Sequence, residues 1–271
     1  MINGIGETAQ YSSTAQTESN ELHIEDCKRQ DIYGFSYNPQ NDGYYPYRLD
    51  GMPVHLSAIG VGQSCFVFPT EENGITLDFH SAEKFFSPDL SSAERQLLYE
   101  NTLDVKEFQE NDRRYVYSGE RQESEIHLVG KLSVFAKVAI NAGTCIGVYA
   151  GEVINDNNFN KFSKSDLDSH ALIFDICSGF VKSEEVIVGD GAISRIKGIF
   201  ERSENSGWHE GSSGYNVCMA GVPGKMNNGD ELLIPCCFAI SDITPGTELR
   251  LHYGYSNQMV ENAMNKYHLT I

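Results

Sequence analysis

The sequence predicts a mostly β fold built from small sheets, preceded by an N-terminal region of mixed α and β structure. Short apolar runs rich in Val, Ile and Phe recur beyond Asp112, and Gly, Asn and Asp residues separate them. This spacing is typical of short strands joined by turns. Hydrophobic residues make up 40% of the 271 residues, which is enough for a packed core.

Residues 1–20 form a polar leader that is expected to be disordered. They include ten Ser, Thr, Gln or Asn residues and no Lys or Arg, so they lack the basic start and apolar centre of a secretory signal. A loose terminus is one interpretation. The other is the leader of a secreted bacterial effector, which would be delivered unfolded into a host cell.

Residues 21–120 are predicted to form an N-terminal region that packs on the core that follows. Aromatic residues alternate with turn-forming residues from Ile32 to Phe79, which indicates short strands and turns. One helix is clearly indicated, because Ser91 to Glu94 is a capping box and Leu98 and Tyr99 continue an apolar face.

A β-rich domain with a C-terminal helix is predicted for residues 121–271. The strands expected in the second half of the chain are 114–118, 133–138, 145–149, 171–176, 186–188, 232–240 and 248–253. The tail from Met259 to Tyr267 is expected to be helical. The Gly- and Ser-rich segment 206–215 is expected to be a loop, on which Trp208 either anchors a partner or packs against the domain.

The net charge restricts the class of partner. The 38 acidic residues outnumber the 20 basic ones, which gives a formal charge of −18. This balance argues against direct nucleic acid binding, which needs clustered Lys and Arg, and favours a basic protein or peptide. The longest apolar run, Leu232 to Ile240, contains Pro235 and is shorter than the ~20 residues of a membrane span. A soluble protein is therefore expected.

The seven cysteines form no Cys-x-x-Cys pair, so no metal site is expected. Their odd number predicts reduced thiols in an intracellular, reducing compartment. Cys65 and His80 also suggest a cysteine hydrolase, but such a nucleophile favours a helix N-terminus. The residues after Cys65 read as a strand, so a buried structural cysteine is the preferred interpretation.

Two stretches resemble the beginning and the end of a SET domain. The first comprises Lys131 to Lys137, Ile140 to Thr144 and Ile146 to Ile154, and the second is Phe238 to Tyr255. They occur in the order and at the spacing of the family, and with the insert between them they cover residues 127–257. The chain is therefore similar to the SET-domain protein lysine methyltransferases, as a divergent member.

The resemblance implies small twisted sheets with a pseudoknot, in which S-adenosylmethionine and the target peptide enter from opposite faces. The methyl group is displaced directly from a sulfonium by a neutral lysine amine. Alignment of the two reactants and a favourable electrostatic environment can supply much of the rate enhancement. The site must also lower the lysine pKa from its ordinary value of ~10.4.

The resemblance assigns roles to residues near the C-terminus. Tyr253 matches the catalytic tyrosine, whereas the alternative is a strand-end tyrosine that packs on the sheet. Leu251 falls at the position that tunes the number of methyl groups. Phe174, in the insert, and Tyr255 are expected to line the substrate channel with Leu251. No Cys-x-Cys cluster follows Gly254, so the C-terminal helix would have to close the channel.

The cofactor motifs depart from the family pattern. Lys131-Leu132-Ser133 replaces a Gly-x-Gly run. Lys131 either compensates by pairing with the carboxylate of the cofactor or is an ordinary solvated surface lysine. Two registers compete for the missing Asn-His-Ser signature: Gly198 to Phe200, or Glu201 to Ser203, of which the second is preferred. The candidate cofactor-binding residues are Lys131, Leu132, Ser133, Glu201, Arg202, Ser203 and Asn205. These departures leave a second hypothesis open, a catalytically degenerate SET-fold module that binds proteins.

Overall fold

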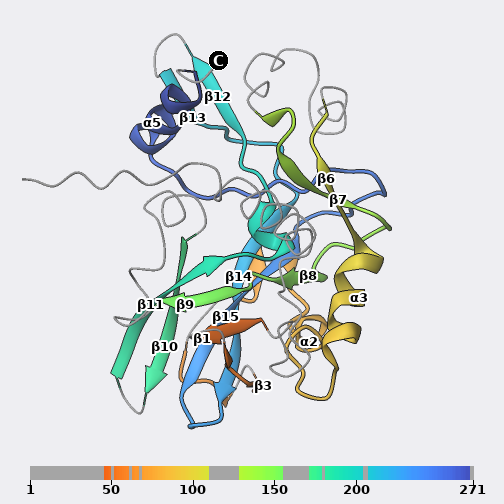
Figure 1. Cartoon of the computed structure of the whole chain (residues 1–271), viewed down its shortest axis with the longest axis vertical. Helices are drawn as coiled ribbons and strands as arrows, with labels where there is room; N and C mark the ends of the chain where they lie inside the picture. The colour runs from red at the N-terminus through yellow and green to blue at the C-terminus, as the bar shows by residue number, and fades with distance from the viewer. Residues whose placement is uncertain are drawn as a thin grey trace, which may run out of the picture.

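Strands predominate in the computed structural model, which describes residues 46–49, 52–60, 63–66, 69–109, 128–154, 171–178, 181–203 and 207–268 (Figure 1). The predicted mostly β fold, with helices in its N-terminal part, is confirmed. The elements are β1 (Tyr47–Leu49), β2 (Met52–Pro53), β3 (Leu56–Ala58), β4 (Glu71–Glu72), β5 (Ile75–Thr76), α2 (His80–Glu83), α3 (Ser92–Thr102), β6 (Leu103–Glu107), β7 (Leu132–Ala136), β8 (Cys145–Val148), β9 (Gly151–Ile154), β10 (Ala171–Ser178), β11 (Val181–Gly189), the 3-10 helix η5 (Ala192–Arg195), β12 (Phe200–Ser203), β13 (Gly207–Glu210), β14 (Val217–Met226), β15 (Glu231–Ala239) and α5 (Asn257–His268). The expected leader 1–20 and the expected strand 114–118 lie outside the described residues.

The largest sheet joins strands from both halves of the chain. Its order is β2-β1-β9-β11-β10-β15-β14-β3, and β8 pairs with β15 outside this path. The hairpin of β14 and β15 runs in register from Val217 opposite Ala239 to Lys225 opposite Glu231. Most of β15 is buried, which explains why its sequence is a nearly continuous apolar run. The remaining pairs, β4-β5, β6-β7 and β12-β13, are small separate sheets.

The predicted capping box begins α3. The Ser91 side chain accepts a hydrogen bond from the Glu94 amide, and the Glu94 carboxylate accepts one from the Ser91 amide at 2.8 Å. The helix packs on β8, where the Val148 amide donates to the Tyr99 hydroxyl at 3.2 Å. This contact places the N-terminal part of the chain against the central strands.

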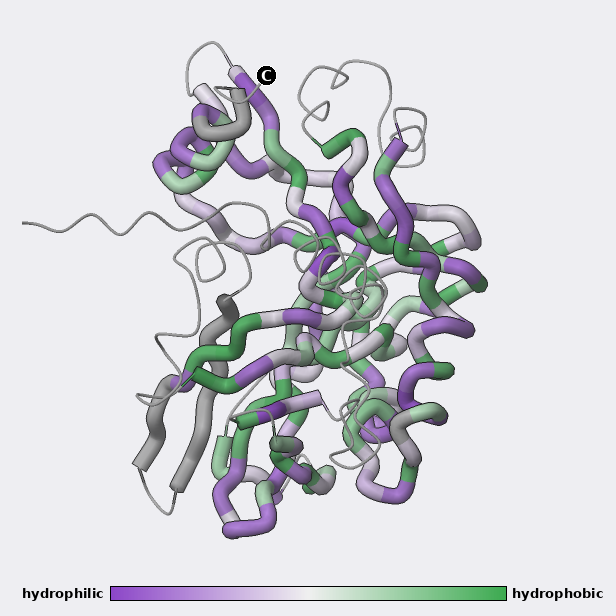
Figure 2. Tube along the Cα trace, in the orientation of Figure 1, coloured by the Kyte–Doolittle hydropathy of each residue, from purple (hydrophilic) through white to green (hydrophobic). Residues whose placement is uncertain are grey.

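One hydrophobic core extends through most of the molecule. It contains Phe86 of the N-terminal part, Ile146 of β8, Phe238 of β15 and Leu249, each fully buried. In Figure 2 hydrophobic residues follow the central strands, whereas the turn between β14 and β15 is hydrophilic. Among the described helices, none is both long and apolar enough to cross a membrane.

Two expectations about local structure were wrong. The segment 206–215 was expected to be a loop, but Gly207–Glu210 forms β13, which pairs with β12. The expected strand 248–253 is instead an irregular segment that makes isolated bridges to several parts of the chain. In both cases tertiary partners override the local pattern: the C-terminal helix packs against β13, and several neighbours share the bonds of 248–253.

The predicted C-terminal helix is confirmed as α5. Its residues Val260 and Met264 are buried with Trp208 of β13, which is 5% exposed. Trp208 therefore packs against the domain, which was one of the two interpretations. Figure 1 shows α5 beside the β12-β13 hairpin, at one end of the molecule. The side chain of Tyr267 lies outside the described residues.

Replacing Leu249 tests how much the fold depends on the irregular segment. Leu249 is 0% exposed, so Leu249→Ala should lower the free energy of unfolding by about 2–5 kcal/mol through lost burial and a cavity. Urea unfolding followed by circular dichroism measures it. Met259→Ala is the control, since Met259 is 55% exposed and its loss should cost less than about 0.5 kcal/mol. Equal effects of the two changes would contradict this packing.

Candidate active site

Residues 248–255, the threaded segment, run between two other parts of the chain. On one side the Leu249 amide donates to the Val134 carbonyl of β7 at 2.8 Å. On the other side the Leu251 amide donates to the Lys197 carbonyl at 3.1 Å. The two stretches that resemble a SET domain, and the segment near residue 197, are therefore hydrogen-bonded side by side.

Asn216 holds the threaded segment from a third direction. Its side-chain amide donates to the Glu248 carbonyl at 2.8 Å, and its side-chain oxygen accepts the Arg250 amide at 2.8 Å. The side chains of Glu248 and Arg250 are both 0% exposed and form an ion pair, with Nη2 and Oε2 2.6 Å apart. The Arg250 guanidinium also donates to the Gly198 carbonyl at 2.8 Å and lies 5.6 Å from the centre of the Phe108 ring.

Tyr253 lies near the end of this segment, with its ring partly exposed and its hydroxyl among buried groups. The hydroxyl donates to the Ile196 carbonyl at 2.7 Å. The ring stacks on that of Tyr255, with centroids 5.1 Å apart and planes 11° apart. Burial raises the pKa of Tyr253 well above its ordinary value, and the neighbouring Tyr149 and Tyr255 raise it further. The hydroxyl therefore stays protonated near neutral pH and can donate a hydrogen bond, but it cannot act as a base.

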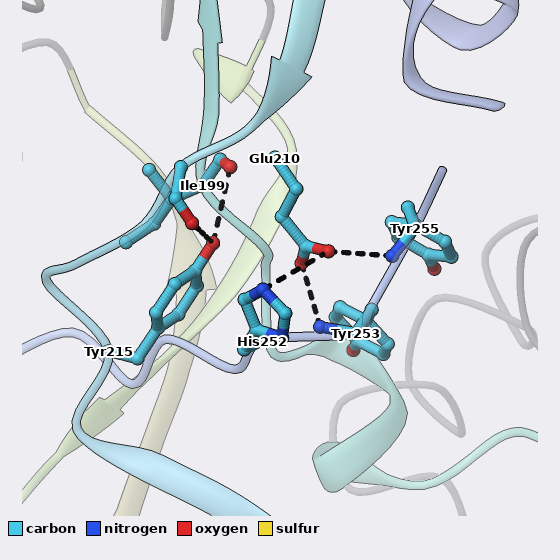
Figure 3. A network of polar contacts seen from close by, with 7 residues as sticks. Ile199, Glu210, Tyr215, His252, Tyr253 and Tyr255 are labelled. Atoms are coloured by element: carbon cyan, nitrogen blue, oxygen red, sulfur yellow. Dashed lines mark hydrogen bonds and ion pairs between the residues drawn. The ribbon is translucent and has the colours of Figure 1, made fainter. Parts of the chain in front are cut away.

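Glu210, the last residue of β13, holds the backbone on both sides of Gly254 (Figure 3). Its Oε1 accepts the Tyr253 amide and its Oε2 accepts the Tyr255 amide, each at 2.7 Å. Oε2 also lies 3.8 Å from Nε2 of His252. Gly254 has φ of +71°, a conformation that favours glycine and that turns both amides toward one carboxylate.

Tyr215 supports the same region from the other side of His252 (Figure 3). Its hydroxyl donates to the Gly211 carbonyl at 2.8 Å, and the Ile199 carbonyl is 3.4 Å away. The edge of its ring meets His252, with centroids 5.0 Å apart and planes at 88°. The Tyr215 hydroxyl thus links Gly211, just after β13, to Ile199, just before β12.

Lys197 carries a perturbed amine next to the threaded segment. Its pKa is lowered to about 8, mainly by burial and in addition by the nearby positive charges of Arg195, Arg250 and Lys131. Glu248 acts in the opposite direction. The site therefore holds an excess of positive charge, because the carboxylate of Glu248 already pairs with Arg250.

Residues 131–133 lie at the start of β7, beside the threaded segment. Lys131 is exposed, Leu132 is half-buried and Ser133 is 0% exposed. Among the residues that the structure describes, the Ser133 hydroxyl has no hydrogen-bond partner. A buried hydroxyl without a partner is costly, so it marks a place where a polar group can bind.

Residues 201–203 lie in β12 and pair with β13 rather than with the threaded segment. Glu201 is half-buried, with Oε2 3.9 Å from Nε2 of His209, and Arg202 is exposed. Asn205 lies outside the described residues. The bonds to the threaded segment come instead from Ile196, Lys197 and Gly198. Gly198 begins the other of the two registers, and Ile196 and Lys197 directly precede it.

The expected channel residues are only partly described. Tyr253 and Tyr255 stack on each other, and Leu251 is 2% exposed within the main core. Phe174 lies in β10, and its side chain is outside the described part of the structure. Sequence reasoning missed Glu210 and Lys197. For Lys197 a signal exists, because the alternative register places it just before the expected signature. Glu210 lies in segment 206–215, whose Gly and Ser residues predict a loop.

The solved structures that this chain matches include SET-domain proteins. The crystal structure of ATXR5 in complex with mono-methylated histone H3.1 is 18% identical, covers 83% of this chain and 94% of that chain, and has a TM-score of 0.35. The SET domain of ATXR5 with di-methylated histone H3 is 18% identical over 70% of this chain and 76% of that one, with a TM-score of 0.34. The methyltransferase domain of the human histone-lysine N-methyltransferase SETMAR is 20% identical over 45% of this chain and 40% of that one, with a TM-score of 0.28. No family model matches the chain, and no curated protein matches its sequence. Likenesses at these TM-scores carry no argument about activity, which has to be argued from the site itself.

The residues beside the threaded segment fit the amino-acid end of S-adenosylmethionine, the cofactor that the SET resemblance implies. The ammonium groups of Lys131 and Lys197 can pair with its carboxylate, since charge-assisted hydrogen bonds of this kind are the strong ones. The Ser133 hydroxyl offers a buried polar contact that the described residues leave unused. Lys197 directly follows Ile196, whose carbonyl receives the Tyr253 hydroxyl.

The charge at Lys197 should make stability depend on pH. The pKa of about 8 lies below the ordinary lysine pKa of ~10.4 in an unfolded chain. Below pH 8 the amine is charged in both states, so its burial lowers the free energy of unfolding by the full amount. Between about pH 8 and ~10.4 the folded state has lost the proton of this amine, whereas the unfolded state still binds it. The free energy of unfolding therefore rises with pH over this range, and the penalty disappears. Lys197→Met should therefore raise the free energy of unfolding at pH 6.5, by on the order of 1–3 kcal/mol, and by less at pH 9.5.

Urea unfolding of both proteins at these two pH values tests this prediction. Lys225→Met is the control, because Lys225 is an exposed lysine of β14 and its loss should change stability by less than about 0.5 kcal/mol. A loss of stability in Lys197→Met at pH 6.5, or a gain that does not depend on pH, would contradict the interpretation.

Proposed function

We propose that the chain is an S-adenosylmethionine-dependent protein lysine N-methyltransferase that acts on a basic protein. The observation that carries the proposal is the placement of Tyr253. Its protonated hydroxyl lies at the threaded segment, bound to Ile196 and next to Lys197. The motif that suggested this tyrosine from sequence is thus found where three distant parts of the chain meet.

Tyr253 would act as a polar contact in the transfer of the methyl group. A hydroxyl that is fixed in advance can stabilise developing charge without reorganisation during the reaction. Its raised pKa suits this role, because a phenolate would compete with the substrate amine. S-adenosylmethionine, when bound, supplies the methyl group from its sulfonium.

The same surroundings favour the neutral form of a substrate lysine. Burial and neighbouring cations lower the pKa of Lys197 to about 8, and an incoming amine near Arg195 and Arg250 would meet the same two effects. A lysine with a lowered pKa is more often uncharged near neutral pH, which is the form that can accept a methyl group.

The net charge supports a basic protein as the substrate. With 38 acidic and 20 basic residues, the chain attracts Lys- and Arg-rich segments and repels nucleic acid. The N-terminal region would help to choose the substrate, since β1 and β3 belong to the same sheet as β9 and β14.

Tyr253→Phe tests the role of the hydroxyl. We expect transfer of radiolabelled methyl groups to basic proteins to fall by a factor of about 10²–10³, the cost of losing one preorganised polar contact. The melting curve should stay close to that of the wild type, because one hydrogen bond contributes roughly 1 kcal/mol to stability.

Tyr99→Phe is the matched control, because it removes a buried tyrosine hydroxyl that lies in the core against β8. It should keep transfer near the wild-type rate. Equal transfer by wild type and Tyr253→Phe would exclude Tyr253 as the catalytic residue. No transfer by either protein, with a basic partner retained in a pull-down, would favour the degenerate binding module.

A further inference from the structure

We propose that Glu210 is a positioning residue that fixes Tyr253 and Tyr255, and that it links the β12-β13 hairpin and α5 to the site. This inference deepens the proposed function and rests on it. The geometry that carries it is the bridge that one buried carboxylate makes between two backbone amides on either side of Gly254 (Figure 3).

The Glu210 carboxylate suits this place better than a neutral group. Its side chain is 3% exposed, and burying a carboxylate is costly unless its oxygens are hydrogen-bonded. Both oxygens accept backbone amides at 2.7 Å, which satisfies this requirement. Hydrogen bonds to a charged acceptor are stronger than neutral ones, so the two amides are held firmly.

The position of Tyr253 depends on these bonds. The Tyr253 amide bound to Glu210 and the Tyr253 hydroxyl bound to Ile196 fix the residue at its two ends. The Tyr255 amide is fixed by the same carboxylate, and its ring is the one on which Tyr253 stacks. A shift of Glu210 would therefore move both rings together.

Glu210 is in turn placed by the packing of α5 on β13. The Glu261 carboxylate of α5 accepts the Trp208 amide at 2.8 Å, and the Trp208 side chain is buried with Val260 and Met264. Trp208 and Glu210 are only two residues apart on the same strand. The hairpin and helix thus form one unit. It contacts the tyrosines through Glu210, which holds their amides, and through the Phe200 ring, whose centroid is 6.0 Å from that of Tyr255.

Glu210→Gln is the sharpest test, because the amide keeps the size of the side chain and loses one acceptor. One carbonyl oxygen remains for two amides, and the new NH2 group faces a backbone donor. Hydrogen exchange of the Tyr253 and Tyr255 amides should become about ten- to a hundredfold faster. In the transfer assay kcat should fall about ten- to a hundredfold with little change in KM, as expected for a misplaced catalytic group.

Glu231→Gln is the matched control. Glu231 of β15 also accepts a backbone amide, that of Cys65 at 2.8 Å, but it lies outside the site. This variant should leave kcat and the exchange of the Tyr253 and Tyr255 amides unchanged. If Glu210→Gln does not fold, Glu210→Asp keeps the charge with a shorter reach and should give smaller changes in the same direction.

The exchange measurement does not depend on activity, so failure of this inference can be told from failure of the proposed function. Unchanged exchange in folded Glu210→Gln would overturn the inference. Faster exchange in Glu210→Gln, combined with a kcat equal to that of the control Glu231→Gln, would also overturn the inference. Glu210 would then hold the backbone without affecting catalysis. If the wild type transfers no methyl group, the proposed function fails, and the exchange result alone decides whether Glu210 holds Tyr253 in place.

Discussion

Every backbone amide and carbonyl of residues 248–251 of the threaded segment needs a partner, because these residues are buried and an unpaired buried group costs about as much as a lost hydrogen bond. No single strand supplies these partners. Val134, Lys197 and Asn216 each supply some of them, and Glu210 supplies those of the two tyrosine amides. The shape of the site follows from this constraint, since the chain near residue 134, near residue 197 and at residues 210–216 must meet around one segment.

The same crowding brings charges into the interior. Glu248 and Arg250 are fully buried, and such a pair contributes little net stability, because removal of two charges from water offsets most of their attraction. Lys197 adds a further cation whose pKa burial lowers. This cluster of buried charges supports the proposed function. Positive charge around a buried hydroxyl suits the binding of a carboxylate and the deprotonation of an amine.

The elements that could be predicted from sequence are those with local signals. The capping box at Ser91 and Glu94 fixed the start of α3, and the apolar run of β15 indicated a buried strand. Hairpin β12-β13 could not be predicted, because β13 owes its place to Trp208 packing on a helix some fifty residues further along the chain. Tyr253 was singled out by its motif. Glu210 has no such motif, since a carboxylate that binds two amides is recognised only when the backbone around Gly254 is known.

Calorimetric titration of the intact chain with S-adenosylmethionine tests most directly whether the charged residues around the threaded segment form a cofactor site. The account predicts saturable binding of one molecule per chain, with a Kd between about 1 μM and 1 mM, the range common for enzyme substrates. Folded protein that shows no binding at millimolar cofactor would contradict it and would favour a protein-binding module.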